Sequence, residues 1–256
     1  MHDQFALDAQ AAIVTGASRG IGRTVATRLA DEGVDVTICS RDEDEITETA
    51  AEIDDSHEGN CHGVECDVRD RESVAAMVEA TVEDFGGVDL LVNNAGASFM
   101  SSFDDISENG WESVIGVNLR GTVNCTQAAS EHLKDDGGAV VNLASLAGQQ
   151  GAPYMSHYAA AKAAIINLTT SLAYEWADDD VRVNCVAPGY VATPGLESQM
   201  GISAEAIDRE SVDRTVGLSE EVADVVQFLA SEGASFLTGE TITPCGKPQI
   251  EDVPDV

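Results

Sequence analysis

The chain reads Thr15-Gly16-Ala17-Ser18-Arg19-Gly20-Ile21-Gly22 between a short apolar run at 11–15 and a helical pattern at 23–30. Glycines at 16, 20 and 22 permit a tight turn and let a ligand approach the backbone closely. A helix that begins at such a turn has free N–H groups in its first turn, and these bind phosphate groups. Because the turn lies between a strand pattern and a helix pattern, it predicts a pyrophosphate-binding site of the dinucleotide type.

The rest of the chain repeats this alternation of short strands and longer helices. Apolar, β-branched runs predict strands at 11–15, 34–39, 62–66, 88–92, 139–143, 181–187 and 241–243. Helical patterns run to about Asp31, from Asp42, and over 71–85, 107–133, 157–176 and 220–230. Regular alternation is typical of a parallel sheet with crossover helices. We therefore expect one doubly wound α/β domain over residues 1–256, with a parallel seven-stranded sheet and a mobile substrate lid at about 190–215.

Acidic residues dominate the composition, because 46 Asp and Glu face 13 Lys and Arg, which gives a formal net charge of −33. Such a surface repels nucleic acids and anionic membranes, so we expect neither as a partner. The self-repulsion of the chain is screened in molar salt, where the Debye length falls to about 3 Å. The composition therefore predicts a halophilic protein of a salt-rich cytosol, more stable and more active in molar KCl than in dilute buffer.

The sequence contains no pattern typical of a membrane span, a targeting segment or a metal site. The chain has no apolar run long enough to cross a membrane and no basic N-terminal cluster of a signal or transit peptide, so the cytoplasm is the expected compartment. The six cysteines form no Cys-x-x-Cys pair, and neither they nor the histidines show metal-ligand spacing. We expect buried thiols in a reducing compartment and no metal site.

Further motifs follow the glycine turn in a regular order. They are Asp67-Val68, Asn93-Asn94-Ala95-Gly96, Asn118, Ser145, Tyr158-Ala159-Ala160-Ala161-Lys162 and Pro188-Gly189. Together with the Gly-x-x-x-Gly-x-Gly spacing of the turn, they resemble the classical short-chain dehydrogenase/reductase family over nearly the whole chain. The resemblance implies a Rossmann-type domain, a nicotinamide cofactor, and hydride transfer between that cofactor and a carbonyl or secondary alcohol.

Two of these residues have a chemistry that follows from their spacing. Tyr158 and Lys162 are four residues apart on a predicted helix, so their side chains lie on one face. A free tyrosine, with a pKa of about 10, is a poor base at neutral pH, and a neighbouring ammonium favours its phenolate. Tyr158 is thus expected to exchange the proton that accompanies hydride transfer. His157 points away from Tyr158 on a helix, so we expect a structural role or a place at the substrate rim.

The resemblance assigns the roles of the other site residues. Lys162 would lower the pKa of Tyr158 and bind the nicotinamide ribose. Ser145 would polarise the carbonyl oxygen, and Asn118 would hold a water that links Lys162 to solvent. The expected catalytic set is Asn118, Ser145, Tyr158 and Lys162. The expected cofactor contacts are Gly16, Ser18, Arg19, Gly20, Ile21, Gly22, Ser40, Arg41, Asp67, Val68, Asn94, Ala95, Gly96, Tyr158, Lys162, Pro188, Gly189, Val191 and Thr193.

The end of the second strand bears on the choice between NAD and NADP. An acidic residue there accepts hydrogen bonds from the ribose hydroxyls and repels a 2′-phosphate. This chain has Ser40 and Arg41 at that place and Arg19 in the glycine turn, and guanidinium groups suit phosphate. The resemblance associates basic residues at these places with NADP(H). The alternative is that Arg41 only pairs with the acidic residues 42–45, which leaves NAD(H) possible.

The substrate is less well defined by the sequence. The nearest general resemblance is to 3-oxoacyl-carrier-protein and acetoacetyl-CoA reductases, which implies a 3-oxoacyl thioester or a similar ketone as substrate and a homotetramer as assembly. A sugar dehydrogenase of the glucose 1-type and a non-catalytic NADP(H)-binding sensor are the alternatives. The chain departs from the family pattern at residues 243–247, Thr-Pro-Cys-Gly-Lys, where an Asp-Gly-Gly-like element is usual, and its tail continues to Val256.

Overall fold

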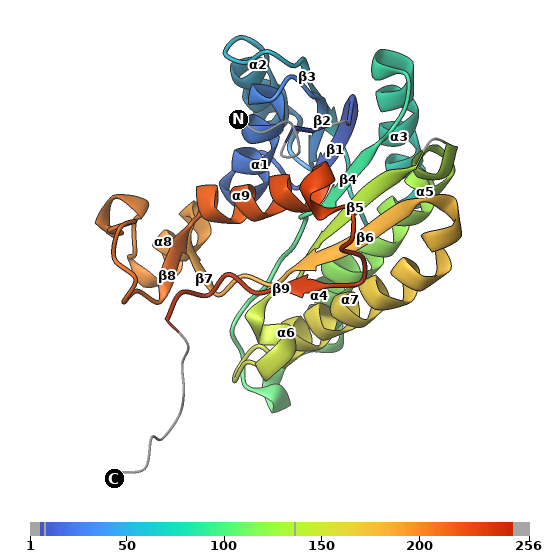
Figure 1. Cartoon of the computed structure of the whole chain (residues 1–256). Helices are drawn as coiled ribbons and strands as arrows, with labels where there is room; N and C mark the ends of the chain where they lie inside the picture. Colours follow the sequence, from blue (N-terminus) through green and yellow to red (C-terminus); the bar gives the residue numbers. More distant parts are fainter. Residues whose placement is uncertain (1–5, 8, 136, 248–256) are drawn as a thin grey trace.

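The computed structural model describes residues 6–7, 9–135 and 137–247. Within them, seven strands form one parallel sheet in the order β3-β2-β1-β4-β5-β6-β9 (Figure 1). The strands are β1 (Ala11–Thr15), β2 (Asp35–Ser40), β3 (Cys61–Glu65), β4 (Leu90–Asn93), β5 (Gly138–Leu143), β6 (Val181–Val186) and β9 (Thr241–Ile242). The order of strand addition reverses between β3 and β4, so β1 and β4 flank the switch point at which open α/β sheets bind ligands. The predicted seven-stranded, doubly wound fold is confirmed.

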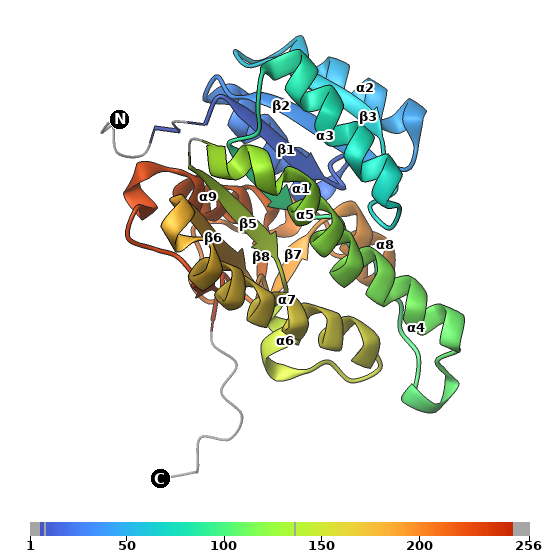
Figure 2. The ribbon, with the colours of Figure 1, turned by 90° about the vertical axis from the view of Figure 1, so that its right-hand side faces the viewer.

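Helices cover both faces of the sheet, because successive strand residues point to opposite faces and both sets are apolar. Ala12 and Val14 of β1 belong to one core cluster, whereas Ile13 belongs to the other. The helices on the first face are α1 (Gly20–Asp31), α2 (Glu43–Asp54) and α9 (Ser219–Ala230). Those on the second face are α3 (Arg71–Phe85), α5 (Gly121–Asp135) and α7 (Ser156–Glu175). Figure 2 looks onto the second face, with α3, α5 and α7 in front of the strands.

Most predicted elements occur within one or two residues of their expected bounds, which is the ordinary uncertainty of element ends. The clearest difference lies in the helical stretch expected over 107–133. There α4 (Glu108–Ile115) is joined to α5 by a π-helical turn, Gly116–Arg120. Single π turns inside helices occur frequently at functional sites. Asn118, an expected site residue, lies in this turn.

The expected lid forms a small unit beside the carboxyl end of β6. The segment at 190–215 contains β7 (Tyr190–Ala192) and α8 (Pro194–Met200), and β7 pairs in parallel with β8 (Val216–Leu218), which follows the segment. The C-terminal segment contacts both ends of this unit. The Gly189 N–H donates to the Pro244 carbonyl at 3.0 Å, and the Lys247 N–H donates to the Arg214 carbonyl at 2.9 Å. The tail at 248–256 lies outside the described residues.

All six cysteines are free thiols, and Cys39, Cys66, Cys125 and Cys185 are buried. The described part of the chain holds no group of three or more metal-ligating side chains arranged for a metal ion. None of the helices in the described residues is both long and apolar enough to span a membrane.

Candidate active site

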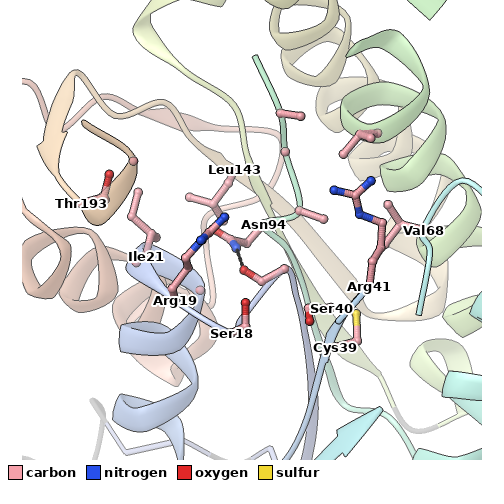
Figure 3. A pocket seen from close by; sticks show the side chains of 18 of the residues that line it. Ser18, Arg19, Ile21, Cys39, Ser40, Arg41, Val68, Asn94, Leu143 and Thr193 are labelled. Atoms are coloured by element: carbon pink, nitrogen blue, oxygen red, sulfur yellow. Dashed lines mark hydrogen bonds between the residues drawn. The ribbon is translucent and has the colours of Figure 1, made fainter. Parts of the chain in front are cut away.

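A pocket of about 530 Å³ lies at the carboxyl ends of the central strands, next to the switch point of the sheet (Figure 3). The glycine turn, the ends of β2 and β3, the segment after β4 and the start of α8 surround it. The expected cofactor contacts that line it are Gly16, Ser18, Arg19, Gly20, Ile21, Gly22, Ser40, Arg41, Asp67, Val68, Asn94, Ala95, Gly96, Tyr158, Lys162, Pro188 and Thr193.

The glycine turn is shaped by close packing against the segment after β4. Gly16 has a φ of +65°, and a β-carbon there would lie 2.7 Å from the Cα of Ala95. A β-carbon at Gly22 would lie 2.4 Å from Nδ2 of Asn94. That amide donates to the carbonyl oxygens of Thr15 and Gly16, at 2.8 and 2.9 Å. Asn94 therefore braces the turn, and any side chain at position 16 or 22 would displace it.

The start of α1 differs from the starts of the neighbouring helices. Five of them begin with a capping side chain, namely Asp42 for α2, Asp70 for α3, Ser107 for α4, Ser145 for α6 (Leu146–Gln150) and Thr193 for α8. Arg19, the residue before α1, makes no capping hydrogen bond, and the first turn holds no acidic residue. The first N–H groups of α1 and the positive end of its dipole are left for an anion. The residues present thus fit the pyrophosphate of a dinucleotide.

Two arginines lie at the end of the pocket formed by β2 (Figure 3). Arg19 is only 4.0 Å from Glu45, at the limit of an ion pair. Arg41 makes no ion pair and no hydrogen bond within the described residues, since Asp42 instead accepts from the Glu45 N–H at 3.0 Å as the cap of α2. The hydrogen bond from Arg69 lowers the pKa of the Asp67 carboxyl, and the nearby charge of Arg41 lowers it further. Because Arg41 itself has no hydrogen-bond or ion-pair partner among the described residues, its guanidinium is available to a ligand.

Lys162 lies buried at the opposite end of the pocket. Its Nζ donates to the Leu143 carbonyl, at the end of β5, at 2.7 Å. Burial lowers the pKa of Lys162 to about 8. The same Nζ lies 5.5 Å from the centroid of the Tyr158 ring, so the two side chains share one end of the pocket.

Tyr158 does not have the lowered pKa that we expected from Lys162. Burial raises the pKa of the phenol, and a hydrogen bond with Ser145 opposes this only in part. Removing a phenol from water disfavours the phenolate more than the nearby groups of the chain favour it. Tyr158 is therefore a neutral phenol at neutral pH, which is the form that a proton donor needs.

Ser145 and Asn118 lie beside this pair. The Ser145 hydroxyl accepts from the Ala147 N–H at 3.2 Å, at the start of α6 (Leu146–Gln150). The Asn118 amide donates to the carbonyls of Ala97 and Val114, both at 2.8 Å, and its Oδ1 is buried without a hydrogen-bond partner among the described residues.

Asn118 and Lys162 both lie close to Gly96. A β-carbon at Gly96 would lie 2.9 Å from the Asn118 Oδ1 and 3.6 Å from the Lys162 Nζ, so only glycine fits between the two side chains without displacing one of them. A buried acceptor without a partner and an ammonium so near to each other fit a water-mediated link.

Two expected contacts lie elsewhere. Gly189 packs against Cys245, because a β-carbon at Gly189 would lie 3.1 Å from the Cβ of Cys245. Val191, on β7, is buried in the hydrophobic core. Neither lines the pocket, so their contact with a cofactor stays a prediction. Cys39 and Cys66, which we did not expect at the site, also line the pocket. Both are the last residues of predicted strands, at 34–39 and 62–66, and ligands meet a parallel sheet at the carboxyl ends of its strands.

His157 has the structural surroundings that its helix position predicted. Its buried ring lies edge-on to Phe99, with 4.3 Å between ring centroids, and stacks on Trp111 at 6.3 Å. Burial lowers the pKa of His157, so it is a neutral imidazole that holds the segment after β4 against α4 and α7.

Comparison with known proteins adds a family to this geometry. The family model described as enoyl-(acyl carrier protein) reductase matches residues 16–246, from the glycine turn to the C-terminal segment. The chain belongs to the short-chain dehydrogenase/reductase family. It is therefore an oxidoreductase with a nicotinamide cofactor, and the resemblance drawn from the motifs is confirmed at this level.

Individual short-chain dehydrogenases/reductases match the chain over almost its whole length. The 3-oxoacyl-[acyl-carrier-protein] reductase FabG of Staphylococcus aureus is 36% identical over 91% of this chain and 95% of its own. The short-chain reductase protein NovJ of Streptomyces niveus is 39% identical over 90% of both chains. A solved short-chain type dehydrogenase/reductase from Mycobacterium marinum superposes with a TM-score of 0.87 at 32% identity, covering 95% of this chain and 97% of that one.

Proposed function

We propose that this enzyme reduces a ketone to a secondary alcohol with NADPH, the ketone belonging to a 3-oxoacyl thioester or a similar compound. The observation that carries the proposal is the position of Tyr158, whose ring centroid lies 5.5 Å from the Nζ of the buried Lys162, at one end of a pocket whose glycine turn fits a pyrophosphate. The similarity to a 3-oxoacyl-[acyl-carrier-protein] reductase supports the choice of a ketone.

The chain's residues would divide the chemistry as follows. A nicotinamide held at this end of the pocket would supply the hydride. Tyr158 would donate its phenolic proton to the carbonyl oxygen, and Ser145, beside Tyr158, would orient that oxygen. Lys162 would hold the ribose and stabilise the resulting phenolate, and Asn118, close to Lys162 at Gly96, would link it to solvent through a water.

The preference for NADP(H) rests on Arg41. In a chain with 46 carboxylates, this guanidinium has no ion pair in the described residues and lies on the pocket next to Ser40. An unpaired guanidinium suits the dianionic 2′-phosphate, whereas NAD(H) offers it only ribose hydroxyls.

The test is the oxidation of NADPH in molar KCl with a panel of ketones, ketoesters, sugars and acyl thioesters. We expect turnover of at least one ketone, and loss of kcat by a factor of about 10²–10⁴ in Tyr158→Phe, with NADPH binding retained. Oxidation of a sugar alone would favour a sugar dehydrogenase. Binding of NADPH without turnover of any compound would favour a sensor, and a Tyr158→Phe variant with normal kcat would refute the role of Tyr158.

Three further properties belong to the same proposal. The enzyme would assemble as a homotetramer, which light scattering after gel filtration tests. The segment at 190–215 would close over the substrate, because it carries Thr193 to the pocket. The acidic surface would adapt the enzyme to a salt-rich cytosol.

A further inference from the structure

The cationic side chains of this protein are almost all engaged. Within the described residues, which include all 13 Lys and Arg, every one except Arg41 has a hydrogen-bond or ion-pair partner. The cations nearest in sequence to the lid are paired with carboxylates, namely Arg209 with Asp224, Arg214 with Glu221 and Lys247 with Asp213. Among the described residues that line the pocket, Arg41 is thus the one cation with no hydrogen-bond or ion-pair partner, whereas Lys162, at the other end, bonds the Leu143 carbonyl.

Three segments flank the end of the pocket at which Tyr158 lies, and we call them the rim: residues 99–106, 149–156 and 190–200. The first continues from Ala97 and Ser98, and the third contains Thr193, all of which line the pocket. The Ser101 N–H donates to the Tyr154 carbonyl at 2.9 Å, which places the first two segments side by side.

The rim is apolar and acidic. Its large exposed side chains are Phe99, Met100, Phe103, Tyr154, Tyr190 and Met200. Its charged residues are Asp104, Asp105 and Glu197, and it contains no Lys and no Arg. An apolar surface of this kind suits an uncharged ligand, and the carboxylates disfavour an anionic one.

Arg41 cannot serve the substrate at the rim. It follows β2, whereas Lys162 is bonded to the end of β5, and the strands between them run in the order β2-β1-β4-β5. Three strand spacings of about 4.8 Å separate the two places by roughly 14 Å. The free guanidinium thus lies at the cofactor end and the carbonyl at the other.

We infer that the substrate is an uncharged, apolar ketone or ester rather than a thioester carried on a phosphate-bearing handle. The inference rests on the proposed function and narrows it. A phosphopantetheine or CoA handle would leave the pocket across the rim, where its phosphates meet three carboxylates and no cation. The handle therefore contributes no binding energy, and the acyl part alone determines recognition.

The test compares two thioesters with the same acyl group. Acetoacetyl-N-acetylcysteamine is neutral, whereas acetoacetyl-CoA carries the phosphates, and both are assayed with NADPH at the lowest KCl concentration that keeps the enzyme folded. We expect kcat/KM for the CoA thioester to be no higher than for the neutral one, and free CoA not to compete with the neutral thioester at saturating NADPH. A higher kcat/KM for acetoacetyl-CoA, or inhibition by free CoA that is competitive with the neutral thioester at saturating NADPH, would overturn the inference and leave the proposed function standing. Reduction of no carbonyl compound would overturn both.

A charge reversal at the rim gives a second readout. Glu197→Lys should raise the ratio of kcat/KM for acetoacetyl-CoA to kcat/KM for the neutral thioester about two- to fivefold, the value of one exposed ion pair. Glu83→Lys is the matched control, because Glu83 is an exposed residue near the end of α3, away from the pocket, and the change in net charge is the same. Equal effects of the two variants on both thioesters would contradict the local role of the rim charge.

Discussion

Arg41 and Lys162 are two cations of one pocket held in opposite surroundings. Arg41 is exposed and unpaired, so its charge is solvated until a ligand arrives. Lys162 is 3% exposed and bonded to a backbone carbonyl, so its charge is costly to keep. The exposed, unpaired guanidinium of Arg41 therefore suits the binding of a phosphate. The buried ammonium of Lys162, with a pKa of about 8, can lose its proton near neutral pH.

Removal of the Arg41 side chain should change the choice of cofactor. In Arg41→Ala we expect KM for NADPH to rise by a factor of about 10–100, the value of a charge-assisted hydrogen bond, while KM for NADH stays unchanged. Steady-state kinetics with both cofactors measures this. Arg71→Ala is the control. Arg71 lies on α3, donates to Gln127 and does not line the pocket, so its substitution removes the same charge at a different place. Equal KM changes for NADPH and NADH would contradict the role of Arg41.

The buried Lys162 should also make stability depend on pH. Its folded pKa of about 8 lies below the usual value of 10.5, so the unfolded chain binds the proton more tightly between these values. The contribution of Lys162 to the free energy of unfolding should therefore rise with pH from about 8 to 10.5, and the full penalty of burying its charge should act below pH 8.

The comparison with Lys162→Met isolates this effect. The variant should be more stable than the wild type at pH 7.5, by about 2–3 kcal/mol, and the difference should shrink by pH 10. Urea unfolding at the two pH values measures it, because groups far from Lys162 titrate alike in both proteins and cancel in the difference. A stability difference that does not vary with pH would show that Lys162 carries no such penalty.

At the scale of the elements, the strands were predictable and the contacts between elements were not. The apolar runs at 11–15 and 139–143 predict strands because both faces of a parallel strand are buried. The π turn depends on Asn118 bonding the Ala97 carbonyl, 21 residues away in the chain, which no local pattern reveals. The acidic run after Arg41 suggested an ion pair, but Asp42 is used as a helix cap instead.

Gly148 makes a contact between two elements that the sequence did not predict. It lies on α6 against α7, and a β-carbon there would lie 2.6 Å from the carbonyl carbon of Lys162. Gly148→Ala should therefore push α6, with Ser145 at its start, away from α7. We expect a loss of about 1–3 kcal/mol of stability, or roughly 2–10 °C in Tm, together with a lower kcat. Gly87→Ala is the control, because no atom lies within 4 Å of its β-carbon position. Unchanged Tm and kcat in Gly148→Ala would show that α6 adapts.

For the whole molecule, the net charge of −33 is the property that no single contact offsets. The ion pairs of the described residues engage most of the cations, yet 46 carboxylates remain far in excess of 13 cations. Screening by salt should therefore stabilise the compact state. We expect Tm to rise steadily from dilute buffer to molar KCl, and to rise less in sorbitol of the same osmolarity. A Tm that is equal or lower in molar KCl would contradict adaptation to salt.

Four buried free thiols make local opening of this fold measurable by chemical labelling. Cys39 and Cys66 lie on the pocket, Cys125 lies on α5, and Cys185 lies on β6. A buried thiol reacts with an alkylating reagent only while its region is open, so its rate of labelling measures the free energy of that opening. Since the four thiols lie in different parts of the fold, mass spectrometry of the labelled peptides would measure the local opening of each part in the wild-type protein. Binding of the cofactor should slow the alkylation of Cys39 and Cys66, the two thiols at the pocket.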